Sequence, residues 1–162
     1  MNDTIHYGEV WRRALAGVID AAIIGVAVGA AALLIPSDAE GAAATLIVLA
    51  SGLIMFYRMV LEGSSWQATI GKKLMDLKVI NPEGAQLAFA ATAVRAWPFW
   101  LPGAMLGVTG ELLPVLLVVS LAAIVVIPLT ARRQGLHDFT ARSIVVRRYI
   151  EIDPEPGDGA GA

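Results

Sequence analysis

A long apolar run with a single carboxylate inside it most limits what this chain can fold into. Residues 14–35 are apolar except for Asp20, and they follow Arg12 and Arg13. A helix of about 20 residues spans the hydrocarbon layer of a bilayer, which is roughly 30 Å thick. A carboxylate near the centre of such a helix costs about 2.5–3.5 kcal/mol on insertion scales. The run therefore predicts a membrane span, and Asp20 predicts a buried partner, a water-filled cavity or a functional role.

The composition of the chain also favours a membrane protein. Hydrophobic residues make up 57% and charged residues 16%, whereas soluble domains carry about 25% charged residues. The sequence contains no cysteine, which excludes disulfides, thiolate metal sites and cysteine nucleophiles. Its two histidines, His6 and His137, have no acid at metal-ligand spacing, so we expect no metal site and no cofactor.

Four apolar segments can be distinguished along the chain. They cover residues 14–35, 42–61, 90–108 and 112–130. The third is less regular than the others because it contains Arg95, Pro98 and Pro102. It is interpreted as a tilted or kinked span, or as an interfacial helix that leads into a short span.

The positions of Lys and Arg favour four spans over three. The links between spans one and two and between spans three and four contain only acidic charges: Asp38, Glu40 and Glu111. Four spans place all 12 Lys and Arg on or near one side, which the positive-inside rule makes cytoplasmic. Three spans would put Arg132 and the later arginines opposite the basic residues between spans two and three. We therefore expect an all-α polytopic membrane protein, a four-helix bundle with both termini cytoplasmic.

The segment between the second and third spans, residues 62–89, is predicted to be a structured cytoplasmic loop. Residues 77–80 alternate and favour a strand, and Asn81-Pro82-Glu83-Gly84 is typical of a type I turn. Gln86-Leu87 and residues 143–147 are candidates for a second and a third strand, and the three would pair as a small sheet. We expect three parts in the chain: an N-terminal cytoplasmic segment 1–10, a membrane domain 11–149 and a disordered acidic tail 150–162.

Three separated motifs resemble the RDD family of small bacterial membrane proteins. The opening motif is WRRALAGVID at 11–20; the loop motif comprises Glu62, ATIGKKL at 68–74 and LKV at 77–79; the closing motif is RQGLHDFTA at 133–141. The family signature is an arginine at the start of the first helix, an aspartate inside it and a second aspartate. Arg13, Asp20 and Asp138 match this signature, and the resemblance covers roughly residues 7–149. It implies a multi-pass protein of the bacterial inner membrane, and some family members are proposed to be cation/proton antiporters.

The spacing of Arg13 and Asp20 indicates that the two side chains have different partners. Seven residues place them on one helix face about 10 Å apart, which is too far for a direct ion pair. We expect Arg13 to reach lipid phosphates or cytoplasmic carboxylates, and Asp20 to pair with Arg95. One interpretation is that this pair only joins the first helix to the third. The other is that Asp20 is a protonatable or cation-binding site in a water-accessible cavity.

The remaining polar residues are expected at the cytoplasmic mouth of the bundle. Asp138 either caps a short helix or completes a polar cluster with Arg13 or Lys72. The residues that would support such a cluster are Arg95, Arg133, His137, Lys72 and Glu62. Gly71-Lys72-Lys73 lacks the spacing of a phosphate-binding loop, so Gly71 is expected to allow a close backbone approach or to start a helix.

A stripe of small residues on the first span indicates a surface for close helix packing. Gly17, Ala21, Gly25 and Gly29 recur at spacing four, and such stripes let helices pack closely. Packing within the chain is the default expectation, and a homo-oligomer is the alternative.

Two classes of function remain open. One is a transporter of a cation, a proton or a small solute, with Asp20 central. The other is a non-transporting scaffold or accessory subunit whose cytoplasmic face binds anionic lipid head groups or a protein partner. No nucleophile or phosphate-binding motif is present, so we expect no enzyme activity and no nucleic-acid partner. The expected partners are the lipid bilayer, anionic head groups, a monovalent cation or proton, and a second copy of the chain.

Overall fold

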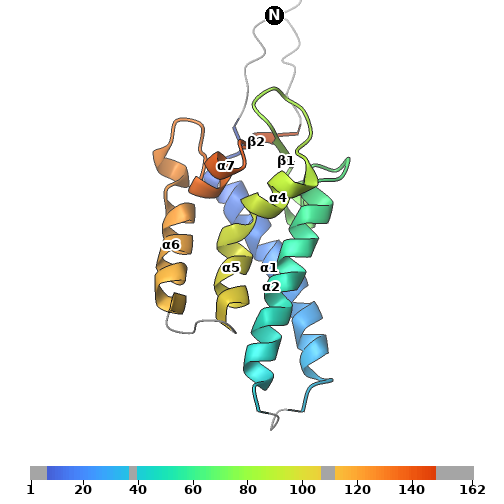
Figure 1. Cartoon of the computed structure of the whole chain (residues 1–162). Helices are drawn as coiled ribbons and strands as arrows, with labels where there is room; N and C mark the ends of the chain where they lie inside the picture. The colour runs from blue at the N-terminus through green and yellow to red at the C-terminus, as the bar shows by residue number, and fades with distance from the viewer. Residues whose placement is uncertain (1–6, 37–39, 107–111, 149–162) are drawn as a thin grey trace, which may run out of the picture.

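The computed structural model describes residues 7–36, 40–106 and 112–148, and most of these residues are helical (Figure 1). The elements follow in this order: α1 (Val10–Ala32), α2 (Ala42–Glu62), α3 (Ile70–Leu74), β1 (Leu77–Ile80), α4 (Phe89–Arg95), α5 (Trp97–Leu106), α6 (Leu113–Val125), η2 (Ile127–Leu129), α7 (Leu136–Thr140) and β2 (Ile144–Arg147). The predicted tail 150–162 and most of the predicted N-terminal segment lie outside the described residues.

Among the described residues, α1 and α2 are the helices long and apolar enough to cross a bilayer. Their most apolar windows have mean hydropathies of 2.1 and 2.0, and only 11% of each window is buried inside the protein. Large apolar side chains such as Val18 and Val26 are 65% and 76% exposed. Exposed apolar surface on this scale is typical of helices that face lipid.

The third and fourth apolar segments form shorter helices than the sequence predicts. The third divides into α4 and α5 at Ala96, because Pro98 cannot donate a hydrogen bond to the carbonyl of Val94. The fourth forms α6 and the short η2. In Figure 1, α5 and α6 end before the far ends of α1 and α2. The interpretation of a kinked third segment agrees with this break, but the described residues do not form four helices of full spanning length.

The predicted pairing of residues 77–80 with residues 143–147 is confirmed. β1 and β2 form an antiparallel two-stranded sheet in which Val79 lies opposite Val145 and Ile80 opposite Ile144. Gly84 has φ +85° and its N–H donates to the carbonyl of Asn81, as the predicted turn requires.

The expected second strand at Gln86-Leu87 is wrong. Both residues lie in a loop and belong to no strand. The Gln86 side chain donates to the carbonyl of Gly63 instead, and Leu87 is buried in the core. These tertiary contacts hold both side chains, so the segment does not pair with β1 as a strand.

The sheet, α3, α4 and α7 lie together at one end of the molecule, here called the sheet end (Figure 1). One face of the sheet packs against α1 through a small core: Ala16, Leu77, Val79, Leu87, Ala141 and Val145. Ile80, Ile144 and Val146 form a second cluster with Tyr7. The sheet end therefore joins the first segment of the chain to the last described one.

The glycines of the small-residue stripe of α1 do not pack against other described residues. A Cβ added at Gly17, Gly25 or Gly29 would meet no atom of the described residues within 4 Å. The expectation of intramolecular packing through this stripe is therefore wrong, because α1 meets α2 and α3 along other residues.

Candidate functional site

Asp20 is buried, with 4% exposure, and both of its carboxylate oxygens are bound by neutral donors. Oδ1 accepts from the Tyr57 hydroxyl at 2.6 Å and from the Gly71 N–H at 2.8 Å, and Oδ2 accepts from the Thr69 hydroxyl at 2.6 Å. Within the described part of the chain it has no Lys or Arg nitrogen at ion-pair distance. The expected pair with Arg95 is therefore wrong.

The start of α3 brings two of these donors, Thr69 and Gly71, to Asp20. Thr69 is the N-cap of α3, where its Oγ1 accepts from the N–H of Lys72 while its hydroxyl donates to Asp20. Gly71 lies so close to α1 that a Cβ would overlap the carbonyl oxygen of Ala16. The predicted close backbone approach at Gly71 is confirmed, and the Thr-x-Gly segment docks α3 onto α1.

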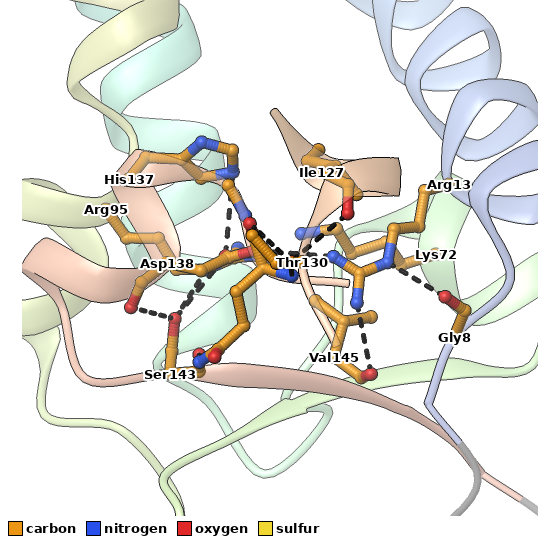
Figure 2. Close-up of polar contacts among 12 residues, drawn as sticks. Gly8, Arg13, Lys72, Arg95, Ile127, Thr130, His137, Asp138, Ser143 and Val145 are labelled. Carbon is orange, nitrogen blue, oxygen red and sulfur yellow. Dashed lines mark hydrogen bonds and ion pairs between the residues drawn. The ribbon is translucent and has the colours of Figure 1, made fainter. Parts of the chain in front are cut away.

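Arg13 and Asp138, the other two signature residues, bind each other (Figure 2). Nη1 of Arg13 lies 3.3 Å from Oδ2 of Asp138, and the guanidinium also donates to the carbonyls of Gly8 and Val145. Asp138 is fully buried and also accepts from the N–H of Gly135 at 3.0 Å. Arg13 was expected to bind lipid phosphates or carboxylates, and in the structure it binds a carboxylate. Asp138 has both of the roles that were expected as alternatives, because it caps α7 and also joins a polar cluster.

Arg95 connects this pair to a second carboxylate. Its Nη2 lies 2.6 Å from Oδ1 of Asp138, and its Nη1 lies 2.5 Å from Oε2 of Glu62. Glu62 also binds Lys72 Nζ at 2.5 Å and lies 3.6 Å from Arg58 Nη1. These residues form one buried ion network, defined here as Arg13, Arg58, Glu62, Lys72, Arg95 and Asp138.

Burial sets the protonation of the groups that α3 and α7 contribute. It lowers the pKa of Lys72 to about 7, with the positive charge of Arg95 acting in the same direction and Glu62 opposing it. Burial also lowers the pKa of His137 to about 4, so this imidazole is neutral near pH 7. Burial raises the pKa of Asp138, but the charge of Arg95 outweighs it and holds that pKa below its usual range. Lys72 is thus the member of the network poised near neutral pH.

A cavity of about 230 Å³ lies beside the ion network. Five of the residues proposed for the site from the sequence border it: Arg13, Asp20, Lys72, Arg95 and His137. The cavity thus brings together side chains from α1, α3, α4 and α7.

Arg133 lies apart from the network. It is half-buried, has no carboxylate partner within the described residues, and borders a separate shallow groove with Trp11. Tyr57, Thr69 and Arg58 were not recognised as site residues from the sequence. Arg58 had a readable signal, since an arginine one helical turn before Glu62 makes an acid–base pair at spacing four inside an apolar run.

The carboxylates of the ion network are engaged in charge pairs. Across the described ranges, no group of three or more His, Cys, Asp or Glu side chains could hold a metal ion. The carboxylates Glu62 and Asp138 instead face guanidinium and ammonium groups.

Comparison with known proteins identifies a family. The model of the RDD family matches residues 7–142, a range that contains Asp20 and the whole ion network. No match to a curated protein or to a solved structure was found.

Proposed function

The chain belongs to the RDD family of membrane proteins, and we propose that it is a non-enzymatic accessory protein of the bacterial inner membrane. In this proposal it has four spans, with α4 and α5 together as the kinked third, and both termini lie in the cytoplasm. The sheet end is its cytoplasmic face and binds anionic lipid.

The distribution of basic residues carries the proposal. All 12 Lys and Arg of the sequence belong to the described residues, and none lies at the far ends of α1, α2, α5 or α6. Eight lie outside the ion network: Arg12, Lys73, Lys78, Arg132, Arg133, Arg142, Arg147 and Arg148. A one-sided basic surface agrees with the positive-inside rule and attracts the anionic cytoplasmic leaflet, by about 1 kcal/mol for each Lys or Arg near the surface.

Two exposed tryptophans support contact with the membrane surface at this end. Trp11 is 52% exposed and lies 4.8 Å from the guanidinium of Arg12, and Trp66 is 41% exposed and stacks with Lys73 at 3.4 Å. Tryptophan beside a basic residue is typical of the interfacial belt of membrane proteins.

Lipid-dependent stability tests the proposal. The full chain, purified in a nonionic detergent, is melted with phosphatidylglycerol or with phosphatidylcholine added. Phosphatidylglycerol should raise the melting temperature more, because a ligand that binds only the folded state stabilises it. Equal shifts with the two lipids would refute anionic-lipid binding.

Transport remains the second candidate, and one observation favours it. Asp20, Lys72 and His137 border a single cavity, so titratable groups of three elements face a common space. The hydrogen bonds from Tyr57, Thr69 and Gly71 argue against it, because they occupy the oxygens that a transported cation would need. A pH-jump flux assay in proteoliposomes distinguishes the candidates: transport requires flux in the wild type that is lost in folded Asp20→Asn, and an accessory protein gives no flux in either.

A further inference from the structure

Among the four cations of the ion network, Arg58 has the weakest polar contacts with the protein. It is 9% exposed, and the contact of its guanidinium with Glu62 is longer than a hydrogen bond. The nearest carboxylate oxygen, in Glu62, is 3.6 Å from Nη1, and the guanidinium carbon also lies 3.9 Å from the centre of the Phe99 ring. A guanidinium has five N–H donors. Arg58 borders the cavity, so a ligand in the cavity can reach donors that the protein leaves unused.

The charges around the cavity leave a positive excess. Arg13, Arg58, Lys72 and Arg95 border it, and the carboxylates of this cluster are Asp20, Glu62 and Asp138. With Lys72 protonated, four cations against three anions leave one positive charge without a counterion. A buried charge without a partner is costly, so the cavity is suited to a ligand with a negative charge.

The walls of the cavity are apolar, and they lie between α1 and the α6–η2 segment. Val10, Ala14 and Gly17 contribute from α1, and Ile124 and Ile127 from the other side. A shallow groove bordered by Trp11 and Arg133 shares Val10 and Pro128 with the cavity, so the two are adjoining. Apolar walls with cations at one end match an amphiphile that has an anionic head.

We propose that this cavity is a specific site for the phosphate of an anionic phospholipid, with Arg58 as its principal ligand. The phosphate enters between α1 and the α6–η2 segment, and the acyl chains stay in the bilayer beside these helices. Arginine suits this role because its planar donors bind phosphate oxygens in a bidentate manner. The inference rests on the proposed function, and it replaces general attraction to the basic surface by one defined site.

Arg58→Gln tests the principal ligand. The variant should fold, because Glu62 keeps Lys72 and Arg95 as partners at 2.5 Å. Native mass spectrometry of the full chain should show that its apparent affinity for phosphatidylglycerol falls about tenfold or more, as expected when a buried charge-assisted contact is lost. Arg132→Gln, which removes an exposed cation near the same end, should leave the affinity unchanged. Loss in Arg132→Gln but not in Arg58→Gln would overturn the assignment.

Gly17→Leu tests the cavity without changing any charge. Gly17 borders the cavity, and a Cβ there meets nothing within 4 Å, so the backbone has room for a leucine whose side chain would occupy cavity space. Gly25→Leu is the matched control, because Gly25 is equally open on the same helix and does not border the cavity. Phosphatidylglycerol binding should be lost in Gly17→Leu and kept in Gly25→Leu; binding retained in Gly17→Leu would exclude this cavity as the site.

The same measurements separate the two proposals and the two sources of phosphate. A wild type that does not prefer phosphatidylglycerol to phosphatidylcholine refutes the proposed function, and this site with it. A preference that survives both Arg58→Gln and Gly17→Leu refutes the site alone. Inorganic phosphate should not displace phosphatidylglycerol; displacement at concentrations equal to those of the lipid would assign the cavity to a soluble anion instead.

Discussion

The carboxylate of Asp20 fixes α3 to α1 through hydrogen bonds from three residues, and this predicts the effect of neutralising it. In Asp20→Asn, one acceptor oxygen is replaced by an NH₂ group that faces hydroxyl and N–H donors. We expect a loss of about 1–3 kcal/mol in unfolding free energy, measured by detergent unfolding of the purified chain.

Tyr57→Phe provides the control for Asp20. It removes one donor of the three and leaves the charge, so the loss should be smaller, about 1 kcal/mol. An Asp20→Asn protein as stable as the wild type, or more stable, would contradict a structural role for this carboxylate and favour transport.

Gly71 is predicted to tolerate no side chain. In Gly71→Ala, the new methyl group would overlap the carbonyl oxygen of Ala16, so α3 must move away from α1. Overpacking of this kind costs about 1–3 kcal/mol, which thermal melting in detergent measures. Gly52→Ala is the control, since a Cβ at Gly52 meets no atom within 4 Å. A wild-type melting temperature for Gly71→Ala would show that the contact with α1 is looser than described.

Replacing Arg95 should lower the unfolding free energy more than replacing Lys72, although both side chains bind Glu62. Arg95→Gln leaves Asp138 and Glu62 without their shared cation, and breaking a buried pair costs about 3–5 kcal/mol. Lys72→Gln should cost less, because Glu62 keeps Arg95. Unfolding titrations should also show that Arg95→Gln with Asp138→Asn recovers part of the loss; equal losses in both single variants would argue against Arg95 as the bridge of the network.

The sequence identified most members of the site but not their partners. Arg13, Asp20 and Asp138 stand out because they are charged residues at matching motif positions, and Arg95 because it lies in an apolar segment. Depth counted along a span suggested that Asp20 pairs with Arg95, but depth does not determine which helix face a side chain occupies. The donors to Asp20 are the hydroxyls of Tyr57 and Thr69 and the backbone N–H of Gly71, and hydrogen bonds of this kind leave no charge pattern in a sequence.

At the scale of elements, α7 is predicted to be the most sensitive to acid. The pKa of His137 is lowered to about 4 in the folded protein, so between about pH 6.5 and 4 the unfolded chain binds a proton that the folded protein does not. Stability should therefore fall as the pH decreases through this window, by about 3 kcal/mol in total. Asp138, whose pKa is also lowered, adds a further loss below its ordinary value of 3.8.

His137→Gln separates the two groups of α7. Melting temperatures measured across this range should become nearly flat between pH 6.5 and 4 in the variant, while the decline at lower pH remains. An unchanged slope in His137→Gln would assign the acid sensitivity to another group.

The elements themselves were predictable to different degrees. The α1 and α2 spans follow from their apolar runs, and β1 and β2 from alternating β-branched residues. The lengths of α5 and α6 did not follow, because a run of apolar residues does not show where Pro98 divides it or where a helix ends. Gln86-Leu87 had strand propensity, but contacts with Gly63 and the core decided its structure.

At the scale of the whole molecule, accessibility labelling tests the four-span topology. The chain has no native cysteine, so single cysteines can replace the exposed residues Glu40, Trp66, Leu112 and Arg142. Glu40 and Leu112 should react with an impermeant thiol reagent from outside the cell, and Trp66 and Arg142 only from the cytoplasmic side. Leu112 labelled from the cytoplasmic side would mean that α5 and α6 return as a hairpin without crossing.

The pairing of the first helix with the last described strand also has a consequence for biosynthesis. Arg13 and Asp138 are 125 positions apart, and β1 cannot pair until β2 has been synthesised. Both Asp138 and β2 follow the fourth apolar segment. During translation, Arg13 and Arg95 therefore emerge before the carboxylate that they share. A nascent chain that stalls early keeps an open strand edge and unmatched guanidiniums. Closure of the sheet end therefore requires that all four apolar segments have already been synthesised.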